Sequence, residues 1–189
     1  MMYTMTNKCK GRKGKYSMKE EVVISEYDPS WVEDYHVERN KIMRVLTEIC
    51  VDFEHIGSTS VPGLGAKPLI DMMAGVHDLN NVQAVHMEAL GELGYEYVPK
   101  SDFPERLFFR KGQWRAGTHH LHVYKYKSVE WKDNLLFRNA LRRDAEVMQA
   151  YYALKKKLEQ QFRHDRVGYT AAKASFIQSI IQKARLYEE

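Results

Sequence analysis

The residues best suited to chemistry lie in one segment, at positions 54–71. A short predicted strand runs into a turn of small and hydroxyl residues: Gly57, Ser58, Thr59 and Ser60. Backbone N–H groups, hydroxyls and an ammonium group, here that of Lys67, are donors that a phosphate group accepts. Asp71 stands inside an apolar run, where its carboxylate could hold a phosphate-bound cation. The segment therefore favours a nucleotide or another phosphorylated small molecule as ligand.

Two simpler interpretations of this segment stay open. The turn is not a Walker A loop, since Gly-x-x-x-x-Gly-Lys-Ser/Thr does not occur, and Pro62, Gly63 and Gly65 could merely shape a tight connection. Asp71 could be a structural carboxylate that accepts hydrogen bonds from the turn, because a buried charge must be paired.

A second candidate group lies on residues 119–126, whose alternating pattern predicts a strand. Alternation places His120 and His122 on one face of that strand. Two neighbouring imidazoles are common metal ligands, so His120, His122 and Asp71 form the candidate metal set. The alternative is that these histidines are packed, hydrogen-bonded side chains.

Basic and aromatic residues farther along the chain could complete a phosphate site. Lys155 and Lys173 each follow a tyrosine by one helical turn, so each pair shares a helix face. A solvated basic surface is the simpler interpretation. The candidates are Arg110, Arg138, Arg142, Lys155, Tyr169 and Lys173.

Periodicity predicts a mixed α/β (α+β) fold that ends in helices. Ser30 and Glu33 form a capping-box pattern at the start of the first helix, and Asn80 is the expected cap of the second. Helical patterns at 131–141, 147–158 and 169–184 follow the last strand. Strands are predicted at 22–24, 51–56, 69–76, 95–98, 106–111 and 119–126.

Composition predicts one globular unit in 189 residues, of which 44% are hydrophobic. Residues 1–20 carry a net charge of +5 and the remainder −1, so the predicted division is a basic disordered leader at 1–20, an α/β core at 21–128 and a packed helical part at 129–189. A nucleic-acid or membrane arm is the alternative for the leader.

The sequence also suggests where the protein is found. No apolar run reaches membrane-spanning length, and Cys9 and Cys50 show neither metal spacing nor a disulfide pattern. A cytoplasmic protein is expected, without a membrane or nucleic-acid partner.

Residues 54–71 read Glu-His-Ile-Gly-Ser-Thr-Ser-Val-Pro-Gly-Leu-Gly-Ala-Lys-Pro-Leu-Ile-Asp and resemble the signature of the GrpB (UPF0157) family. The similarity continues through Tyr27-Asp-Pro-x-Trp31, Arg106-Leu-Phe-Phe109, His119-His-Leu-His-Val123 and Tyr169-x-x-x-Lys-x-x-Phe176 and covers about residues 22–185. That family is grouped with nucleotidyltransferases of the DNA polymerase β kind. The resemblance therefore implies a nucleotidyltransferase-like (polymerase-β-like) core.

Active members of that superfamily hold two metal ions with two carboxylates two positions apart on one strand and a third on a neighbouring strand. Asp71 matches the first carboxylate, whereas Met73 stands in the second place and His122 in the third. The resemblance implies a metal-dependent nucleotidyltransferase that acts on a small acceptor, with Asp71 and His122 as catalytic residues. Glu54 or Glu96 could replace a missing carboxylate.

A divalent ion, Mg²⁺, Mn²⁺ or Zn²⁺, is the expected cofactor, and no organic cofactor is expected. Imidazole ligands favour Zn²⁺ or Mn²⁺ over Mg²⁺. Because the carboxylate set is incomplete, two alternatives stay open: a non-catalytic nucleotide- or phosphate-binding module, and a protein-folding accessory protein.

Overall fold

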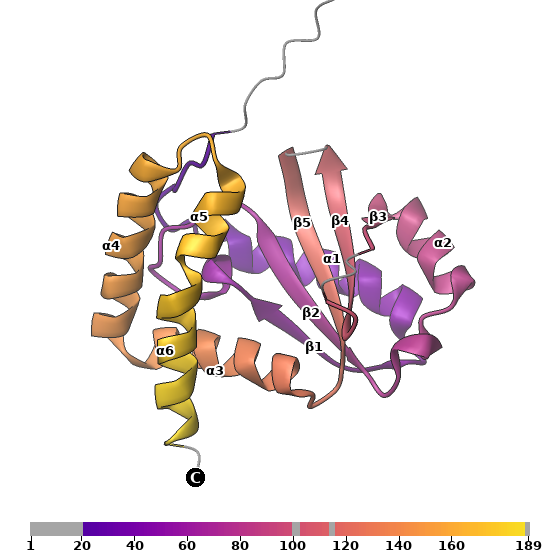
Figure 1. Cartoon of the computed structure of the whole chain (residues 1–189). Coiled ribbons are helices and arrows are strands. Elements are labelled where there is room, and N and C mark those ends of the chain that lie inside the picture. The colour runs from indigo at the N-terminus through magenta and orange to yellow at the C-terminus, as the bar shows by residue number, and fades with distance from the viewer. Residues whose placement is uncertain (1–20, 100–102, 114–115, 188–189) are drawn as a thin grey trace, which may run out of the picture.

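The computed structural model describes residues 21–99, 103–113 and 116–187, so the predicted leader at 1–20 lies outside it. Five strands form one sheet in the order β1-β2-β5-β4-β3 (Figure 1). Strands β2 and β5 run parallel and the other neighbours antiparallel, which confirms the predicted mixed sheet. The strands are β1 (Cys50–Ile56), β2 (Ile70–Val76), β3 (Tyr95–Tyr97), β4 (Arg106–Gln113) and β5 (Ala116–Lys125).

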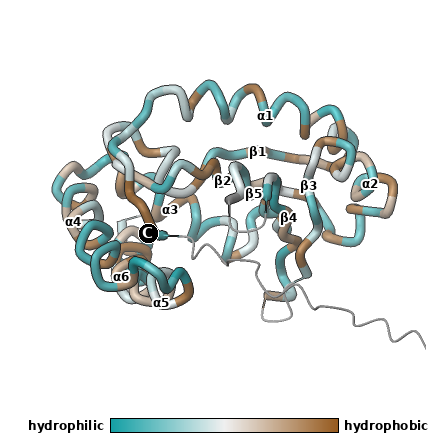
Figure 2. Tube along the Cα trace, turned by 90° about the horizontal axis from the view of Figure 1, so that it is seen from above, coloured by the Kyte–Doolittle hydropathy of each residue, from teal (hydrophilic) through white to brown (hydrophobic). Residues whose placement is uncertain are grey.

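One face of the sheet is covered by α1 (Ser30–Leu46) and α2 (Ala84–Glu92) (Figure 2). The stripe of Trp31, Tyr35, Ile42 and Leu46, formed by helical spacing, belongs to one buried cluster with apolar side chains from all five strands. Glu38 lies within this buried face, where Lys41 and Lys111 pair with its carboxylate. This layer is the main core of the protein.

The opposite face carries the helices that follow the sheet: α3 (Val129–Arg143), α4 (Ala145–Gln161), α5 (Arg166–Ala172) and α6 (Ala174–Arg185). Trp131 of α3 is buried against Ile56, Met73 and Tyr124. Figure 2 shows α5 and α6 on the side of the sheet away from α1. In the described part of the chain, no helix is long and apolar enough to cross a bilayer.

The predicted strand at 22–24 is wrong. Val22 and Ile24 are buried, but they pack against Leu158 and Tyr169 of the C-terminal helices. Their N–H groups donate to the Arg163 carbonyl and to Glu159 instead of to a sheet. The segment therefore ties the start of the described chain to α4 and α5.

The predicted helix caps are also wrong. Helix α1 begins at Ser30 itself, and the Asp28 carboxylate accepts the Ser30 N–H. Asn80 lies in a short 3-10 helix, η2 (Leu79–Asn81), whereas α2 begins after Gln83, which forms a capping box with His86. The Asp28 carboxylate accepts the Ser30 N–H, which the predicted capping box assigns to the side chain of Glu33.

The last of the three predicted C-terminal helices is broken. Residues 169–184 form the end of α5 and all but the last residue of α6, with Lys173 between the two helices. This break separates the tyrosine of the Tyr169/Lys173 pair from the apolar face of α6.

Candidate functional site

The candidate metal ligands converge where β2 and β5 run side by side. In that parallel pair Asp71 is level with His120, and Met73 with His122. Asp71 Oδ1 lies 3.0 Å from His120 Nδ1 and 3.8 Å from His122 Nε2. The three ligand atoms all lie within 4.8 Å of one another. Strand alternation thus places the three side chains together on one sheet face, as expected.

These distances suit a shared cation. Two ligands at about 2.0–2.2 Å from one ion lie no more than about 4.4 Å apart. Both distances from Asp71 fall within that limit. One carboxylate oxygen and two imidazole nitrogens form a donor set typical of Zn²⁺ or Mn²⁺ rather than of Mg²⁺.

Charge is distributed over the group in a form that favours cation binding. Burial alone would raise the pKa of Asp71, but the hydrogen bond with His120 and the nearby His122 imidazole outweigh it and hold that pKa well below its usual range. Burial lowers the pKa of His122, against the opposite effect of Asp71. The group therefore offers a carboxylate and, at His122, the neutral imidazole that metals bind.

Gly57 sits directly against Asp71. Its φ of 71° lies in the left-handed region, and a Cβ there would be 2.6 Å from Asp71 Oδ2. Only glycine meets both requirements without displacing the carboxylate. Gly57 thus brings the turn and Ser58 next to the candidate metal ligands.

The other two hydroxyls of the turn point inward. Thr59 Oγ1 donates to the Leu69 carbonyl and lies 3.1 Å from His55 Nε2, while Ser60 Oγ donates to the Gly57 carbonyl. Both residues are almost fully buried. In this structure Thr59 and Ser60 support the turn, and Ser58 is the hydroxyl residue that lines both of the cavities next to Asp71.

One of these cavities, about 250 Å³ in volume, is here called the basic pocket. Most of the predicted phosphate-binding residues line it, together with Asp71 and His120: Ser58, Thr59, Lys67, Lys155, Tyr169 and Lys173. Arg166 adds a further cationic side chain. With Glu21, Val22 and Ile24 also in its wall, the pocket draws on five separate stretches of the chain.

Lys155 is the most buried cation of this pocket, with 2% of the residue exposed. Its Nζ donates to the Gly65 carbonyl and lies 5.0 Å from the ring centroid of Tyr151. Lys173 Nζ lies 4.4 Å from the Tyr169 ring, so both predicted Tyr/Lys pairs form. Burial, and then the charge of Lys173, lower the pKa of Lys155 to about 7.

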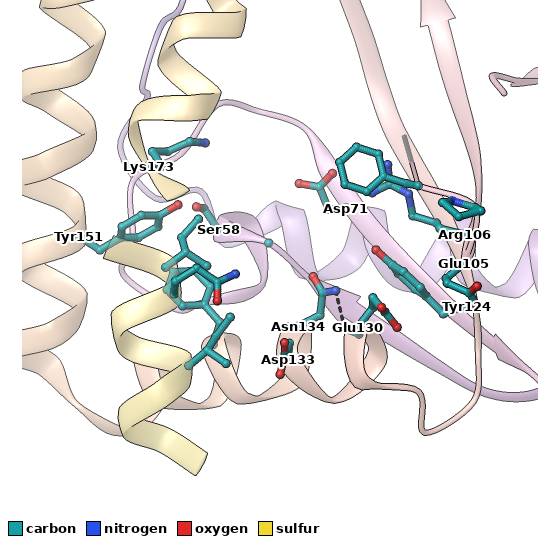
Figure 3. A pocket seen from close by; sticks show the side chains of 17 residues that line it. Ser58, Asp71, Glu105, Arg106, Tyr124, Glu130, Asp133, Asn134, Tyr151 and Lys173 are labelled. Atoms are coloured by element: carbon teal, nitrogen blue, oxygen red, sulfur yellow. Dashed lines mark hydrogen bonds between the residues drawn. The ribbon is translucent and has the colours of Figure 1, made fainter. Parts of the chain in front are cut away.

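The second cavity, here called the cleft, has a volume of about 520 Å³, and Figure 3 shows Asp71 among the side chains that line it. It shares Ser58, Asp71 and Lys173 with the basic pocket. The remaining wall contains side chains that sequence analysis missed as site residues: Phe103, Glu105, Arg106, Tyr124, Glu130, Asp133, Asn134 and Tyr151. They come from the loop before β4, from β4 and β5, and from α3 and α4. Arg106 and Tyr124 lie in segments that the sequence singles out, but the sequence pattern assigns neither residue to the site.

Arg110 lies apart from the other phosphate-site candidates. It is level with His120 on β4, but its Nε and Nη2 both donate to the Glu96 carboxylate. Neither the basic pocket nor the cleft is lined by Arg110.

The amino-acid sequence is similar to those of known proteins. The profile of the family described as GrpB protein matches residues 21–183. The chain belongs to the GrpB family. Similar proteins include glutamate-rich protein GrpB of Alkalihalophilus pseudofirmus, 29% identical over 87% of this chain and 97% of that one, and a UPF0157 protein of Streptomyces coelicolor, 37% identical over 87% and 84%.

Solved structures agree with this assignment. The crystal structure of conserved protein GrpB from Enterococcus faecalis matches with a TM-score of 0.81 and 36% identity over 88% of this chain and all of that one. Cid1 poly(U) polymerase in its Mg 3'-dATP bound form matches with a TM-score of 0.50 and 14% identity, over 72% of this chain and 43% of that one. At that identity the likeness shows the fold alone, and it confirms a nucleotidyltransferase-like core.

Glu54 and Glu96, which could replace a missing metal carboxylate in this GrpB-family chain, both have other partners. Met73 is fully buried in an apolar cluster, on the sheet face that carries Asp71. Glu54 is level with Met73 on β1, but Arg138 binds its carboxylate, and Glu96 binds Arg110. Asp71 is therefore the one carboxylate in the metal-ligand group found among the described residues.

Proposed function

We propose that this GrpB-family protein binds a nucleotide or another phosphorylated small molecule together with a divalent metal ion, and transfers a nucleotidyl group to a small acceptor. The observation that carries the proposal is the position of Asp71. Its carboxylate meets His120 and His122 on one side and forms part of both the basic pocket and the cleft. A cation at Asp71 would therefore touch a phosphate chain in the basic pocket.

Different side chains would bind the phosphates, the nucleoside and the cation. Ser58, Lys155 and Lys173 would bind the phosphate oxygens, since hydroxyl and ammonium groups donate strong hydrogen bonds to them. The cleft, more than twice as large as the basic pocket, would hold the nucleoside and the acceptor. A divalent cation held by Asp71, His120 and His122 would neutralise phosphate charge and polarise the reacting phosphoryl group.

In the transfer step an acceptor oxygen would form a bond to the α-phosphorus while the bond to the bridging oxygen breaks. Pyrophosphate would leave with that electron pair, and the acceptor proton would pass to solvent.

A second candidate function is binding without transfer. The buried Met73 favours it, because one carboxylate neutralises less of the developing phosphate charge than three do. Both functions predict that the ligand and the metal ion bind. Only transfer predicts that pyrophosphate is released.

The test is incubation of the protein with each nucleoside triphosphate and Mg²⁺, Mn²⁺ or Zn²⁺, following pyrophosphate release and thermal stability. Transfer predicts pyrophosphate release that Asp71→Asn abolishes and that Asp34→Asn, at an exposed site on α1, leaves unchanged. A ligand that raises the melting temperature without pyrophosphate release supports binding alone. No stabilisation with any pair would refute both functions.

A further inference from the structure

Two arginines of α3 donate hydrogen bonds to backbone carbonyls on either side of Ser58. Arg138 Nη1 donates to the His55 carbonyl and to Glu54, and Arg142 donates to the Ser60 carbonyl through Nε at 3.1 Å and Nη2 at 2.7 Å. The arginines are four residues apart and so share one helix face. The two carbonyls lie on either side of Gly57 and Ser58.

We propose that Arg138 and Arg142 are positioning residues that fix Ser58 relative to Asp71 for anion binding, and that Arg142 acts through the geometry of its guanidinium rather than through its charge. This inference rests on the proposed function, because Ser58 is taken as a phosphate donor. Neither arginine lines the basic pocket or the cleft, so each would act through the turn.

The turn needs support from outside. Gly57 has a φ of 71°, and its neighbours form only one short 3-10 helix, η1 (Ser58–Ser60). Inside the turn the Ser60 N–H and Oγ donate to the Gly57 carbonyl, and the Val61 N–H donates to the Ser58 carbonyl. These bonds close the loop, and the Thr59 hydroxyl connects its middle to the Leu69 carbonyl directly before β2. The arginines connect both ends of the loop to a long helix.

Arg138 and Arg142 differ in burial. Arg138 is 8% exposed and balances Glu54, so its loss would leave a carboxylate without its partner. Arg142 is exposed, and both of its bonds go to one neutral carbonyl. Replacement of Arg142 therefore tests the geometry without breaking a buried ion pair.

Arg142→Lys keeps the positive charge but loses the planar fork that makes both bonds. The probe is inorganic tripolyphosphate, titrated by calorimetry with Mn²⁺ present, and Mn²⁺ alone is titrated separately. Positioning predicts that Arg142→Lys and Arg142→Ala both weaken tripolyphosphate binding by about tenfold, the loss expected for one charge-assisted hydrogen bond. Mn²⁺ affinity should change by less than about twofold, because its ligands lie on strands.

Arg143→Lys is the matched control, since Arg143 is exposed on the same helix and lies near the Tyr187 ring instead of the turn. Amide hydrogen exchange gives a readout that needs no ligand. Positioning predicts faster exchange confined to residues 57–61 in Arg142→Lys and wild-type exchange in Arg143→Lys.

Three results would overturn the inference: tripolyphosphate binding by Arg142→Lys equal to wild type, unchanged exchange at 57–61, or faster exchange spread over the whole domain. A wild-type protein that binds no tripolyphosphate would instead count against the proposed function. In that case the exchange data alone would decide whether Arg142 positions the turn.

Discussion

At the scale of single residues, the site depends on one close approach. Gly57 lets the turn lie against Asp71 Oδ2, while Asp71 Oδ1 faces the histidines. The carboxylate therefore links the turn that carries Ser58 to the candidate metal ligands. Any side chain at Gly57 must move either the turn or Asp71.

Gly57→Ala should weaken metal binding and also lower the stability of the fold. The added Cβ would meet Asp71 at 2.6 Å, and displacement of a supported ligand costs about 10–100-fold in metal affinity. The left-handed φ should cost about 1–3 kcal/mol of stability. Mn²⁺ titration and thermal melting measure both effects.

Gly91→Ala on α2 is the control for Gly57→Ala, because nothing lies within 4 Å of its added Cβ. It should keep wild-type Mn²⁺ affinity. Equal Mn²⁺ binding by the two variants would show that the approach of Gly57 to Asp71 is unimportant.

Lys155 should make stability depend on pH. Burial lowers its pKa from 10.5 to about 7, so between these values the unfolded chain holds a proton that the folded chain has released. The free energy of unfolding therefore rises with pH through this window, and the stabilisation is lost as pH falls toward 7.

Lys155→Met should flatten that rise between pH 7 and 10, and Lys157→Met, at an exposed site on the same helix, should keep it. Urea unfolding at several pH values provides the measurement. A Lys155→Met slope equal to that of wild type would mean that the buried amine stays protonated.

At the scale of elements, α3 joins the helical part to the sheet. Trp131, 2% exposed, packs on Met73 and Tyr124, and Gly75 leaves room for its ring, since a Cβ there would meet Trp131 at 3.0 Å. The same helix carries Arg138 and Arg142. A shift of α3 against the sheet would therefore also shift the two arginines that bind the turn.

Trp131→Ala should destabilise the protein by about 3–5 kcal/mol, the cost of removing a buried large aromatic side chain. Val129→Ala, at a 61% exposed position in the first turn of α3, should change stability by less than about 0.5 kcal/mol. Chemical denaturation compares the two. A small effect of Trp131→Ala would show that α3 contributes little to the core.

Local pattern predicted much of this arrangement. Strand alternation placed Asp71, His120 and His122 on matching faces, and helical spacing paired Lys155 with Tyr151, because both depend only on backbone period. Strand order and long-range partners are not local. The family resemblance, not the local pattern, predicted that His122 lies on a strand next to that of Asp71, and the pairing of β2 with β5 confirms it. Sequence could not show that Glu96 binds Arg110, or that Thr59 and Ser60 turn inward toward backbone carbonyls.

At the scale of the whole molecule, the family match begins at residue 21, and residues 1–20 lie outside it. Those residues have no apolar period. Deletion of 1–20 should leave the melting temperature within a few degrees, the shift expected for about 1 kcal/mol in a domain of this size. A larger fall in a melting curve would mean that the basic segment contributes to folding.

The candidate site draws on nearly the whole chain. The metal-ligand group comes from β2 and β5, the turn follows β1, and the lysines come from α4 and the junction of α5 with α6. A ligand that bridges these parts should stabilise all of them together, because it binds only the folded state.

The most direct test of the account is a crystal structure with Mn²⁺ and a non-hydrolysable nucleoside triphosphate, with anomalous scattering used to locate the metal. The account predicts an Mn²⁺ peak at about 2.0–2.2 Å from Asp71, His120 and His122. It also predicts that the phosphates lie in the basic pocket beside Ser58, Lys155 and Lys173. A metal peak elsewhere, or a nucleotide bound away from Asp71, would contradict it.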